Sequence, residues 1–236
     1  MIDLTELWNF DDPAGSEQRL RAAQVEAPET EAAVLQTQVA RALGLQGRYA
    51  EALAVLDGIE CTDPEVTVRS LLERGRVYRS SGDVTAAAPL FEAAVAAADQ
   101  GLEGLAIDAM HMVALTLKGD DQIAYTRGIL DRARASRDPS ARRWLASLLN
   151  NLGMAYSDQG EWQLALQTFE EALAERRTGS DLEATFAARW IVAWALRHLG
   201  RTPAARDAQL ALQADLVAAG REDPYVHEEL ALLDQA

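Results

Sequence analysis

Apolar residues recur at spacings of three and four along most of the 236-residue chain, with polar residues between them. This period is that of amphipathic α-helices, and no β-strand is predicted. Gly47, Gly82, Gly160 and Gly200 each stand between two such stretches, five residues before an alanine, and a weaker copy surrounds Gly119. Each glycine therefore marks a turn, and the pattern predicts a series of helical hairpins.

Two of these hairpins share a fuller set of residues. The better copy, at about 146–175, carries Leu149, Leu152, Gly153, Tyr156, Ala165, Phe169 and Ala172, and the other carries Leu71, Gly75, Tyr78, Ala87, Phe91 and Ala94. At these spacings the residues resemble the signature of the tetratricopeptide repeat family, over roughly 33–219 of the chain. The resemblance implies an all-α fold in a bacterial protein: a right-handed α-α superhelix, or solenoid, of about five tetratricopeptide-like hairpins between an N-terminal helix and a C-terminal closing helix.

Two glycines of this signature have a physical explanation. Gly75 and Gly153 fall inside predicted helices, where glycine costs about 1 kcal/mol relative to alanine. A gain in packing must offset that loss, and close approach of the paired helix would supply it. We expect Phe91 and Phe169 to fill the space between neighbouring units.

The predicted helix starts follow the same partition. An aspartate followed by a proline, which caps a helix and fits its first position, occurs at Asp12-Pro13, Asp63-Pro64, Asp138-Pro139 and Asp223-Pro224. Two further segments, Thr62 to Glu65 and Ser180 to Glu183, have the spacing of a capping box. These signals recur where hairpins should begin.

The chain therefore divides into an N-terminal segment, a run of repeats and a closing helix. The predicted bounds are 1–28 for the N-terminal segment, 29–220 for the repeats (about 30–63, 64–102, 103–138, 139–179 and 180–220) and 221–236 for the C-terminal capping helix. The third repeat departs most from the pattern, because Gly128 falls inside its second helix. In a stack stabilised by nearest-neighbour interfaces, such a unit is expected to be the weak joint.

Composition and charge exclude several classes of function. The formal net charge of −15 would repel nucleic acid and anionic lipid, so neither is an expected partner. The first twelve residues do not have the form of a secretory signal, and no apolar run is long enough to span a bilayer. Cys61 is the only cysteine, which fits a reducing compartment. We expect a cytoplasmic protein.

Residues that could carry catalysis or bind a metal are scattered. His111, His198 and His227 lie on different predicted helices without a second metal ligand at a useful spacing, so surface or packing roles are favoured. Cys61 has no histidine near it in sequence, which favours an incidental thiol over a nucleophile. The chain also lacks a phosphate-binding loop, a GxSxG elbow and a dinucleotide fingerprint. We expect no enzyme activity, cofactor or metal.

A partner surface is predicted on the first helix of each hairpin, because the family resemblance implies that these helices line a concave face. The residues expected there are Arg41, Arg69, Arg76, Arg79, Asn150, Asn151, Met154, Trp190, Trp194 and Arg197. Such a groove would suit a protein or a peptide, in particular an acidic or carboxylate-ended one. The lysines of the family's carboxylate clamp are missing, although Asn151 stands where the family often has its asparagine.

Two alternatives for these residues stay open. Trp190, Trp194 and Arg197 share one helical face, and the tryptophans could anchor a partner or pack against the closing helix near Tyr225. The arginines could face a ligand, or they could be neutralised along their own helix, since Glu73 can pair with Arg69 or Arg76.

The sequence accordingly predicts a non-catalytic scaffold or adaptor that binds a protein or peptide on the concave face of the superhelix. One alternative is a regulatory receptor that responds to a peptide or a small molecule. Another is a self-assembling module, a homo-oligomer formed through an end of the stack. An enzyme with an unfamiliar site is the least favoured, and fold resemblance alone does not identify a partner.

Overall fold

The computed structural model describes residues 4–98 and 101–235. Residues 1–3, 99–100 and 236 belong to the predicted N-terminal segment, second repeat and closing helix, and they lie outside the described residues. Within the described residues all regular structure is helical, and the chain divides into two compact units, 1–116 (unit 1) and 117–236 (unit 2). The boundary falls inside the range predicted for the third repeat.

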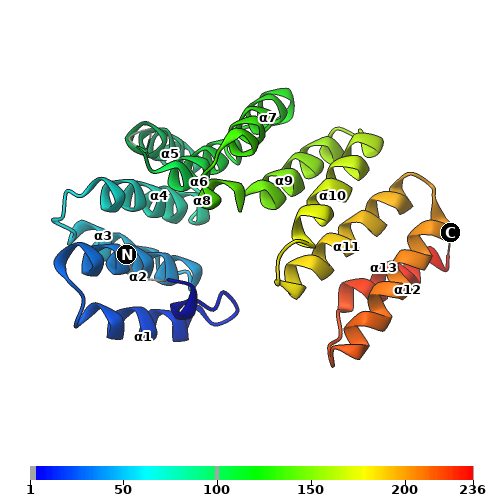
Figure 1. Cartoon of the computed structure of the whole chain (residues 1–236), viewed down its shortest axis with the longest axis horizontal. Coiled ribbons are helices and arrows are strands. Elements are labelled where there is room, and N and C mark those ends of the chain that lie inside the picture. The colour runs from blue at the N-terminus through cyan, green and yellow to red at the C-terminus, as the bar shows by residue number, and fades with distance from the viewer. Residues whose placement is uncertain (1–3, 99–100, 236) are drawn as a thin grey trace. The chain divides into compact units, whose positions relative to one another are not determined.

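Unit 1 consists of a short 3₁₀ helix and six α-helices (Figure 1). They are η1 (Thr5–Leu7), α1 (Pro13–Gln24), α2 (Glu29–Leu45), α3 (Tyr49–Asp57), α4 (Pro64–Ser80), α5 (Val84–Ala98) and α6 (Glu103–Ala114). Helix α2 packs on α3 and α4 packs on α5, which are the first two predicted hairpins. The first helices α2, α4 and α6 contact one another in succession, and α1 packs on α2 as α5 does on α6.

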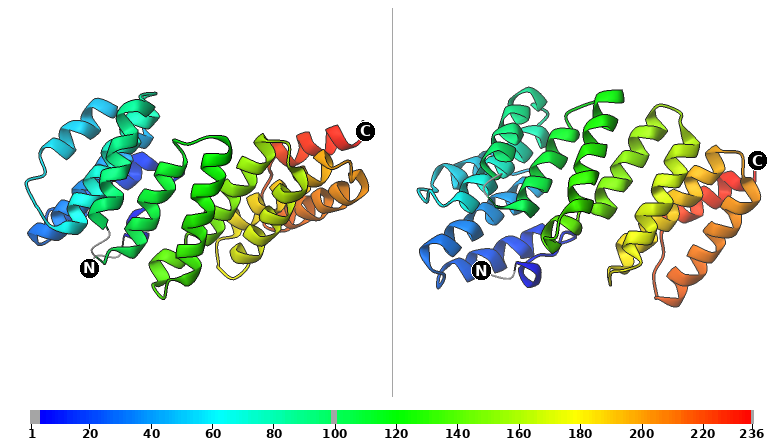
Figure 2. Two further views of the ribbon diagram at one scale, coloured as in Figure 1. Left: turned by 90° about the horizontal axis from the view of Figure 1, so that it is seen from above. Right: turned by 45° about the horizontal axis from the view of Figure 1, so that its top comes forward.

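Unit 2 contains the remaining helices (Figure 2). They are α7 (Gly119–Ala135), α8 (Pro139–Arg142), α9 (Leu145–Asp158), α10 (Trp162–Arg176), α11 (Leu182–His198), α12 (Thr202–Ala218) and α13 (Pro224–Leu233). Helices α9 and α10 form one hairpin, α11 and α12 form the next, and α13 packs on both α11 and α12. The single first helix expected for the fourth repeat is interrupted between α8 and α9, although Arg143 and Trp144 keep helical backbone angles.

The helical glycines lie where the two helices of a hairpin meet. A Cβ built on Gly75 would be 2.4 Å from the Phe91 ring, and one built on Gly153 would be 2.4 Å from the Phe169 ring. Both rings are completely buried. The predicted reason for these glycines is therefore confirmed: an alanine would collide with the ring that fills the hairpin.

This contact defines equivalent positions in all five repeats. Seven residues before each turn glycine stands the packing position, occupied by Ala40, Gly75, Met112, Gly153 and Ala193 in order along the chain. Nine residues after the turn glycine stands its partner position, occupied by Leu56, Phe91, Gly128, Phe169 and Gln209. The third repeat thus has the large residue at the first position and glycine at the second. No heavy atom outside its own helix backbone lies within 4 Å of a Cβ built on Gly128.

Helix caps follow the sequence closely, with two corrections. The side chains of the four Asp-Pro aspartates all accept hydrogen bonds from backbone amides of the first helical turn, as predicted. The capping boxes predicted at Thr62 and Ser180 are wrong, because the neighbouring Asp63 and Asp181 are the N-cap residues. A carboxylate one residue later satisfies the same amides, so the hydroxyl is not needed.

Candidate functional site

The first helices carry two equivalent side chains beside each packing position. We call the residues two before and one after the packing position the stripe residues. They are Gln38 and Arg41 on α2, Glu73 and Arg76 on α4, Met110 and Val113 on α6, Asn151 and Met154 on α9, and Ile191 and Trp194 on α11. Five of the predicted binding residues belong to this set: Arg41, Arg76, Asn151, Met154 and Trp194. The others lie one or a few residues away on the same helices.

In unit 1 three stripe residues, Arg41, Glu73 and Arg76, form an ionic cluster with Asp108 of α6. The Arg76 guanidinium donates to Glu73 Oε1 at 2.5 Å on its own helix and also to Asp108 on α6. Arg41 on α2 approaches the same Glu73 Oε1 at 3.5 Å. The Glu73 side chain is only 3% exposed, and its Oε2 accepts no hydrogen bond from the described residues. The cluster therefore joins α2 to α4 through the buried Glu73 carboxylate, and α4 to α6 through Arg76 and Asp108.

The charges of this cluster depend on one another. Burial alone would lower the pKa of Arg76, but Asp108 and Glu73 raise it above its usual value. The pKa of Arg41 is lowered, first by burial and then by the nearby Arg76, with Glu73 and Asp108 opposing. Both guanidinium groups remain charged at neutral pH. Buried charges of this kind are tolerated only while their partners are in place.

The other predicted arginines of α4 lie outside this cluster. Arg69 pairs with Glu65 at 2.8 Å, not with Glu73. Arg79 is exposed and forms no ion pair within the part of the chain that the structure describes. It lies near His111 of α6, whose pKa is lowered mainly by burial and further by Arg76 and Arg79, while Asp108 opposes the shift. The self-neutralised alternative thus describes Arg76, which pairs with Glu73 as expected, and Arg69, whose partner is Glu65, whereas Arg79 stays available to solvent.

In unit 2 the equivalent region is aromatic. Trp194 packs edge-on against Trp162 of α10, with ring centroids 4.9 Å apart, and lies beside Trp190 at 6.2 Å. His198 stacks on Trp162 with centroids 3.9 Å apart, so this histidine has the packing role that its sequence position favours. We call Trp162, Trp190, Trp194 and His198 the aromatic cluster. Burial, with a smaller contribution from Arg197, lowers the pKa of His198.

The closing helix α13 covers part of this cluster. The Trp190 indole donates to the Tyr225 backbone oxygen at 3.1 Å, and the two rings meet edge to face. Arg197 forms a two-pronged ion pair with Glu229, at 2.7 and 2.8 Å, and the Glu229 side chain is 5% exposed. Packing against α13 is therefore the arrangement that the structure has for Trp190 and Arg197.

The predicted polar residues of α9 are half-buried or exposed. Asn150 and Asn151 are half-buried, and Met154 is 37% exposed although it is a large apolar residue. The tryptophans of α11, in contrast, contact α10 and α13.

Three of these ion pairs share one separation along the chain. Arg41 and Glu73, Arg76 and Asp108, and Arg197 and Glu229 are each 32 residues apart. Each pair joins a first helix to the next first helix. Sequence analysis did not single out Asp108 or Glu229, and the repeated separation of opposite charges is the signal that could have identified them.

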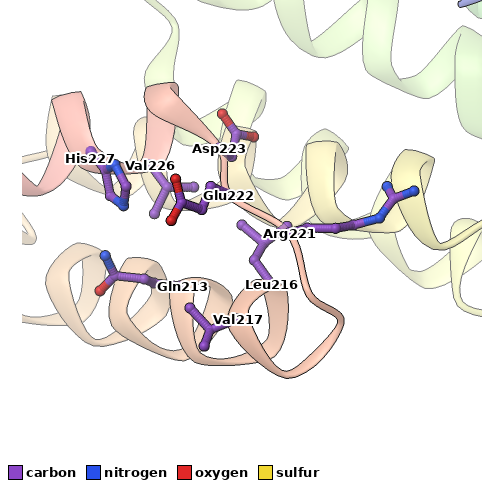
Figure 3. A pocket seen from close by; sticks show the side chains of 8 residues that line it. All are labelled: Gln213, Leu216, Val217, Arg221, Glu222, Asp223, Val226 and His227. Atoms are coloured by element: carbon purple, nitrogen blue, oxygen red, sulfur yellow. The ribbon is translucent and has the colours of Figure 1, made fainter.

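The remaining hollow, histidine and cysteine of the described residues offer weaker candidate sites than the stripe residues. A small hollow lies where α12 meets the loop before α13, between Leu216, Val217 and Val226, with Arg221 directed away from it (Figure 3). His227 lines this hollow, and Cys61 lies half-buried in the loop after α3. Among the described residues, no group of three histidine, cysteine or acidic side chains is placed to hold a metal. No described helix is long and apolar enough to cross a membrane.

Comparisons with known proteins point to one family. Two family models described as tetratricopeptide repeat match residues 144–210 and 40–101, which together exceed half of the chain. Curated protein sequences give no match.

Solved structures agree with the family match. A structure of TPR-like repeats, nearly identical to one another, from a kinesin light chain of Podosopora anserina is 21% identical in sequence to this chain. The TM-score is 0.60, and the match covers 84% of this chain and 100% of that one. The apo quorum sensor NprR from B. thuringiensis is 17% identical, with a TM-score of 0.67, over 94% of this chain and 64% of NprR. NprR in complex with its cognate peptide NprX is 16% identical, with a TM-score of 0.60. That match covers 94% of this chain and 66% of NprR. These similarities confirm the predicted fold class, an all-α solenoid of tetratricopeptide-like hairpins.

Proposed function

Because the chain belongs to the tetratricopeptide repeat family, we propose that it is a non-catalytic scaffold or adaptor that binds a protein or peptide along its first helices. The observation that carries this proposal is the repeated placement of arginine, asparagine, methionine and tryptophan at the stripe positions, beside a packing position that holds a small residue in four of five repeats. Large side chains at equivalent positions of successive helices form the kind of surface that a partner can read repeat by repeat.

The chemistry of the two units suggests what the partner offers. Arg79 is exposed on α4, one turn after Arg76, whereas the charges of Arg41 and Arg76 are balanced by Glu73 and Asp108. In a protein of net charge −15, an exposed arginine at this place favours an acidic or carboxylate-ended peptide by contrast with the rest of the surface. Asn151 and Met154 in unit 2 add an amide for backbone hydrogen bonds and an adaptable apolar contact.

The test is capture of partners by the full chain, followed by mass spectrometry, with two variants chosen for their exposure. Arg79→Glu reverses an exposed charge on a first helix of unit 1, and Met154→Glu places a charge on the exposed thioether of unit 2. Neither side chain is part of a buried cluster, so both variants should fold. We expect each to reduce the yield of a reproducible partner by about tenfold, the effect of losing one good contact.

Matched controls lie on second helices. Arg127→Glu reverses an exposed arginine on α7, and Leu164→Glu changes an exposed apolar residue on α10. These controls should capture the partner as the unchanged chain does. Equal yields from all four variants would contradict the assignment of the binding surface to the first helices.

A second candidate is a receptor that changes state on binding a peptide. Its support is the similarity to NprR, a quorum sensor whose structure is known with and without its cognate peptide. The chain spans 64% of NprR, and only the fold is carried over at 17% identity. For such a receptor, small-angle scattering of the full chain should change on adding the captured peptide. A pure adaptor should show no change beyond the added mass.

Self-assembly through α13 has a narrower basis. This helix has no second helix packed after it in the described residues, and Tyr225 and Leu232 are exposed on it. Light scattering across a hundredfold range of concentration tests whether the end of the stack pairs with a second copy. A constant mass would rule out this assembly.

A further inference from the structure

The segment before α1 follows the first helix of the first repeat. We call residues 4–12 the N-terminal strap. Leu4 packs against the buried cluster of Ala33, Val34 and Val66, near the start of α2 and α4. Further along, Trp8 and then Phe10 lie beside residues of the second half of α2. Successive strap residues therefore contact successive positions along α2.

The strap contacts both stripe residues of α2. The Trp8 indole donates to Gln38 Oε1 at 3.2 Å, and the Arg41 guanidinium lies 5.8 Å from the centre of the Phe10 ring. The Trp8 and Phe10 rings stack on each other with centroids 5.0 Å apart and planes only 10° from parallel. The two stripe positions of the first repeat are thus already in contact with an aromatic pair supplied by the same chain.

The strap is held along its length, but its tip is exposed. Leu4, Leu7 and Trp8 pack against buried clusters, and the Leu7 backbone oxygen accepts from Arg19 at 3.1 Å. Phe10, in contrast, is 61% exposed, and its described contacts are the Trp8 ring and the Arg41 guanidinium. Displacing the aromatic pair therefore means replacing the Trp8 packing and the Phe10–Arg41 contact by equivalent contacts with a partner, while the two leucines keep the segment attached.

The chemistry of the strap matches the surface that it covers. Between Thr5 and Asp12 it contains three acidic residues and no basic one, and its two aromatic side chains are two residues apart. Arg41 pairs with Glu73 at 3.5 Å, so the strap touches one end of the ionic cluster through a cation–π contact. A separate acidic peptide with the same aromatic spacing would find the same contacts.

We propose that the strap is an internal occupant of the partner surface, and that a partner segment of the same chemistry displaces its aromatic pair. The partner segment is extended and acidic, with two aromatic side chains at positions i and i+2. This inference rests on the proposed function, because it assumes that partners bind along the first helices. To that function it adds two statements. It names the chemistry of the partner segment, and it makes the strap a competitor that lowers the apparent affinity of the surface for that segment.

The experiment uses the strap sequence itself as the probe. A fluorescein-labelled, end-blocked peptide of residues 4–12 is titrated with the full chain and with the Trp8→Ala/Phe10→Ala variant, and binding is followed by fluorescence anisotropy. A tethered competitor acts at an effective concentration on the order of millimolar. We therefore expect the variant to bind the peptide at least about tenfold more tightly than the unchanged chain, whose surface is occupied.

Two controls test the contacts. In the Trp8→Ala/Phe10→Ala background, Arg41→Ala should remove the gained affinity. A peptide with alanine at both aromatic positions should bind neither protein. Circular dichroism checks folding, and if the double variant does not fold, Phe10→Ala alone replaces it, because that ring is mostly exposed. Its expected gain is smaller, about threefold, since Trp8 still covers Gln38.

Two results would overturn the proposal: equal affinity for the unchanged chain and the variant, or no binding to either at millimolar peptide. A third would be a concentration-dependent dimer that the double variant abolishes, because the surface would then belong to the strap of a second copy. Each of these outcomes leaves the capture experiment with Arg79→Glu and Met154→Glu unaffected. The proposal about the strap can therefore be contradicted while the proposed function remains supported.

Discussion

In unit 1 three of the four stripe residues of α2 and α4, Arg41, Glu73 and Arg76, belong to the ionic cluster, whereas those of α9 and α11 in unit 2 are amide or apolar. Around Glu73 the charges are shared among three helices. Around Trp194 the contacts are ring against ring, with the Arg197–Glu229 pair beside them. Equivalent positions of the repeat are thus stabilised by ion pairs in unit 1 and by aromatic packing in unit 2.

The difference concerns how each unit tolerates the loss of a side chain. Removing one member of a buried ion pair leaves its partner charged and desolvated, and this penalty exceeds the value of the lost contact. Truncating an aromatic ring at a partly exposed site removes packing but leaves no charge behind. Unit 1 should therefore be the more sensitive to single changes on its first helices.

The largest effect is expected at Arg76. Arg76→Leu leaves Glu73 and Asp108 buried without their partner and should lower the free energy of unfolding by about 3–5 kcal/mol. Arg197→Leu strands only Glu229 and should lower it by about 2 kcal/mol. Urea unfolding followed by circular dichroism gives both values, and tryptophan fluorescence reports chiefly on unit 2, which holds four of the five tryptophans.

A variant without the charged side chains of the cluster separates the effect of stranded charge from the effect of lost packing. Replacing all four members of the cluster, Arg41, Glu73, Arg76 and Asp108, by leucine removes the stranded charges, so most of the lost stability should return. If Arg76→Leu alone changed the unfolding free energy by less than 1 kcal/mol, or the quadruple variant were the less stable, the cluster would not be held by mutual neutralisation.

The next effect is at the packing glycines. Gly75→Ala and Gly153→Ala drive a methyl group into a phenylalanine ring and should each lower stability by about 1–3 kcal/mol. Gly128→Ala is the matched control inside a helix with open space around it, and it should raise stability by up to about 1 kcal/mol. Thermal unfolding of the three variants decides the point. A similar change in all three would mean that helix propensity, not the ring, sets the result.

A gain is expected at Gln209. This residue is 0% exposed and holds the partner position that Phe91 and Phe169 fill elsewhere, yet neither atom of its amide has a hydrogen-bond partner among the described residues. Gln209→Leu removes the unsatisfied amide and should stabilise unit 2 by about 1–2 kcal/mol. Denaturant midpoints measured by tryptophan fluorescence test this, and Gln213→Leu, at a half-buried glutamine beside the small hollow, provides a control. No gain from Gln209→Leu would point to an internal water that satisfies the amide.

The third repeat should open more readily than the fourth. It has Gly128 where the fourth has Phe169, and the boundary between the two units falls within its predicted range. Amides of 105–136 should therefore exchange with solvent several times faster than those of 146–175, a difference of about 1 kcal/mol in opening free energy. Hydrogen exchange with mass spectrometry measures this. Equal or slower exchange in 105–136 would show that the glycine does not weaken the repeat.

The smallest effect concerns pH. Burial lowers the folded-state pKa of His111, so below about pH 6.5 the unfolded state takes up the proton and the folded state does not. Stability should fall as the pH decreases from about 6.5 toward the lowered pKa, by at most about 1.4 kcal/mol per pH unit for each such histidine. His111→Gln should flatten this dependence, and His198→Gln should remove the remaining part from unit 2. An unchanged profile in both variants would assign the dependence to other groups.

Local chemistry explains why much of the fold could be predicted from the sequence. The caps at Asp12, Asp63 and Asp223 depend on residues two or three positions away, and the turn at Gly160 requires a positive φ that glycine adopts easily. The contact between Gly153 and its ring lies inside one hairpin, whose period fixes the register. In each case the sequence window contains all the interacting groups.

The candidate site was less predictable because its contacts join different repeats. Whether Arg76 meets Asp108 depends on the rotation of α4 against α6, which no single hairpin determines. Whether Trp190 is covered depends on where α13 packs. The strap has no helical period, so its position beside Arg41 gives no signal in the sequence.

The 32-residue separation of the three ion pairs limits how this chain can be rearranged. A repeat that supplies the arginine must be followed by one that supplies the acid at the matching turn of its first helix. Exchanging two repeats, or deleting a single residue between Arg41 and Glu73, would misalign both members at once. The ion pairs therefore fix which repeat can follow which. A recombined chain with its repeats in another order would lose the pair at each changed junction.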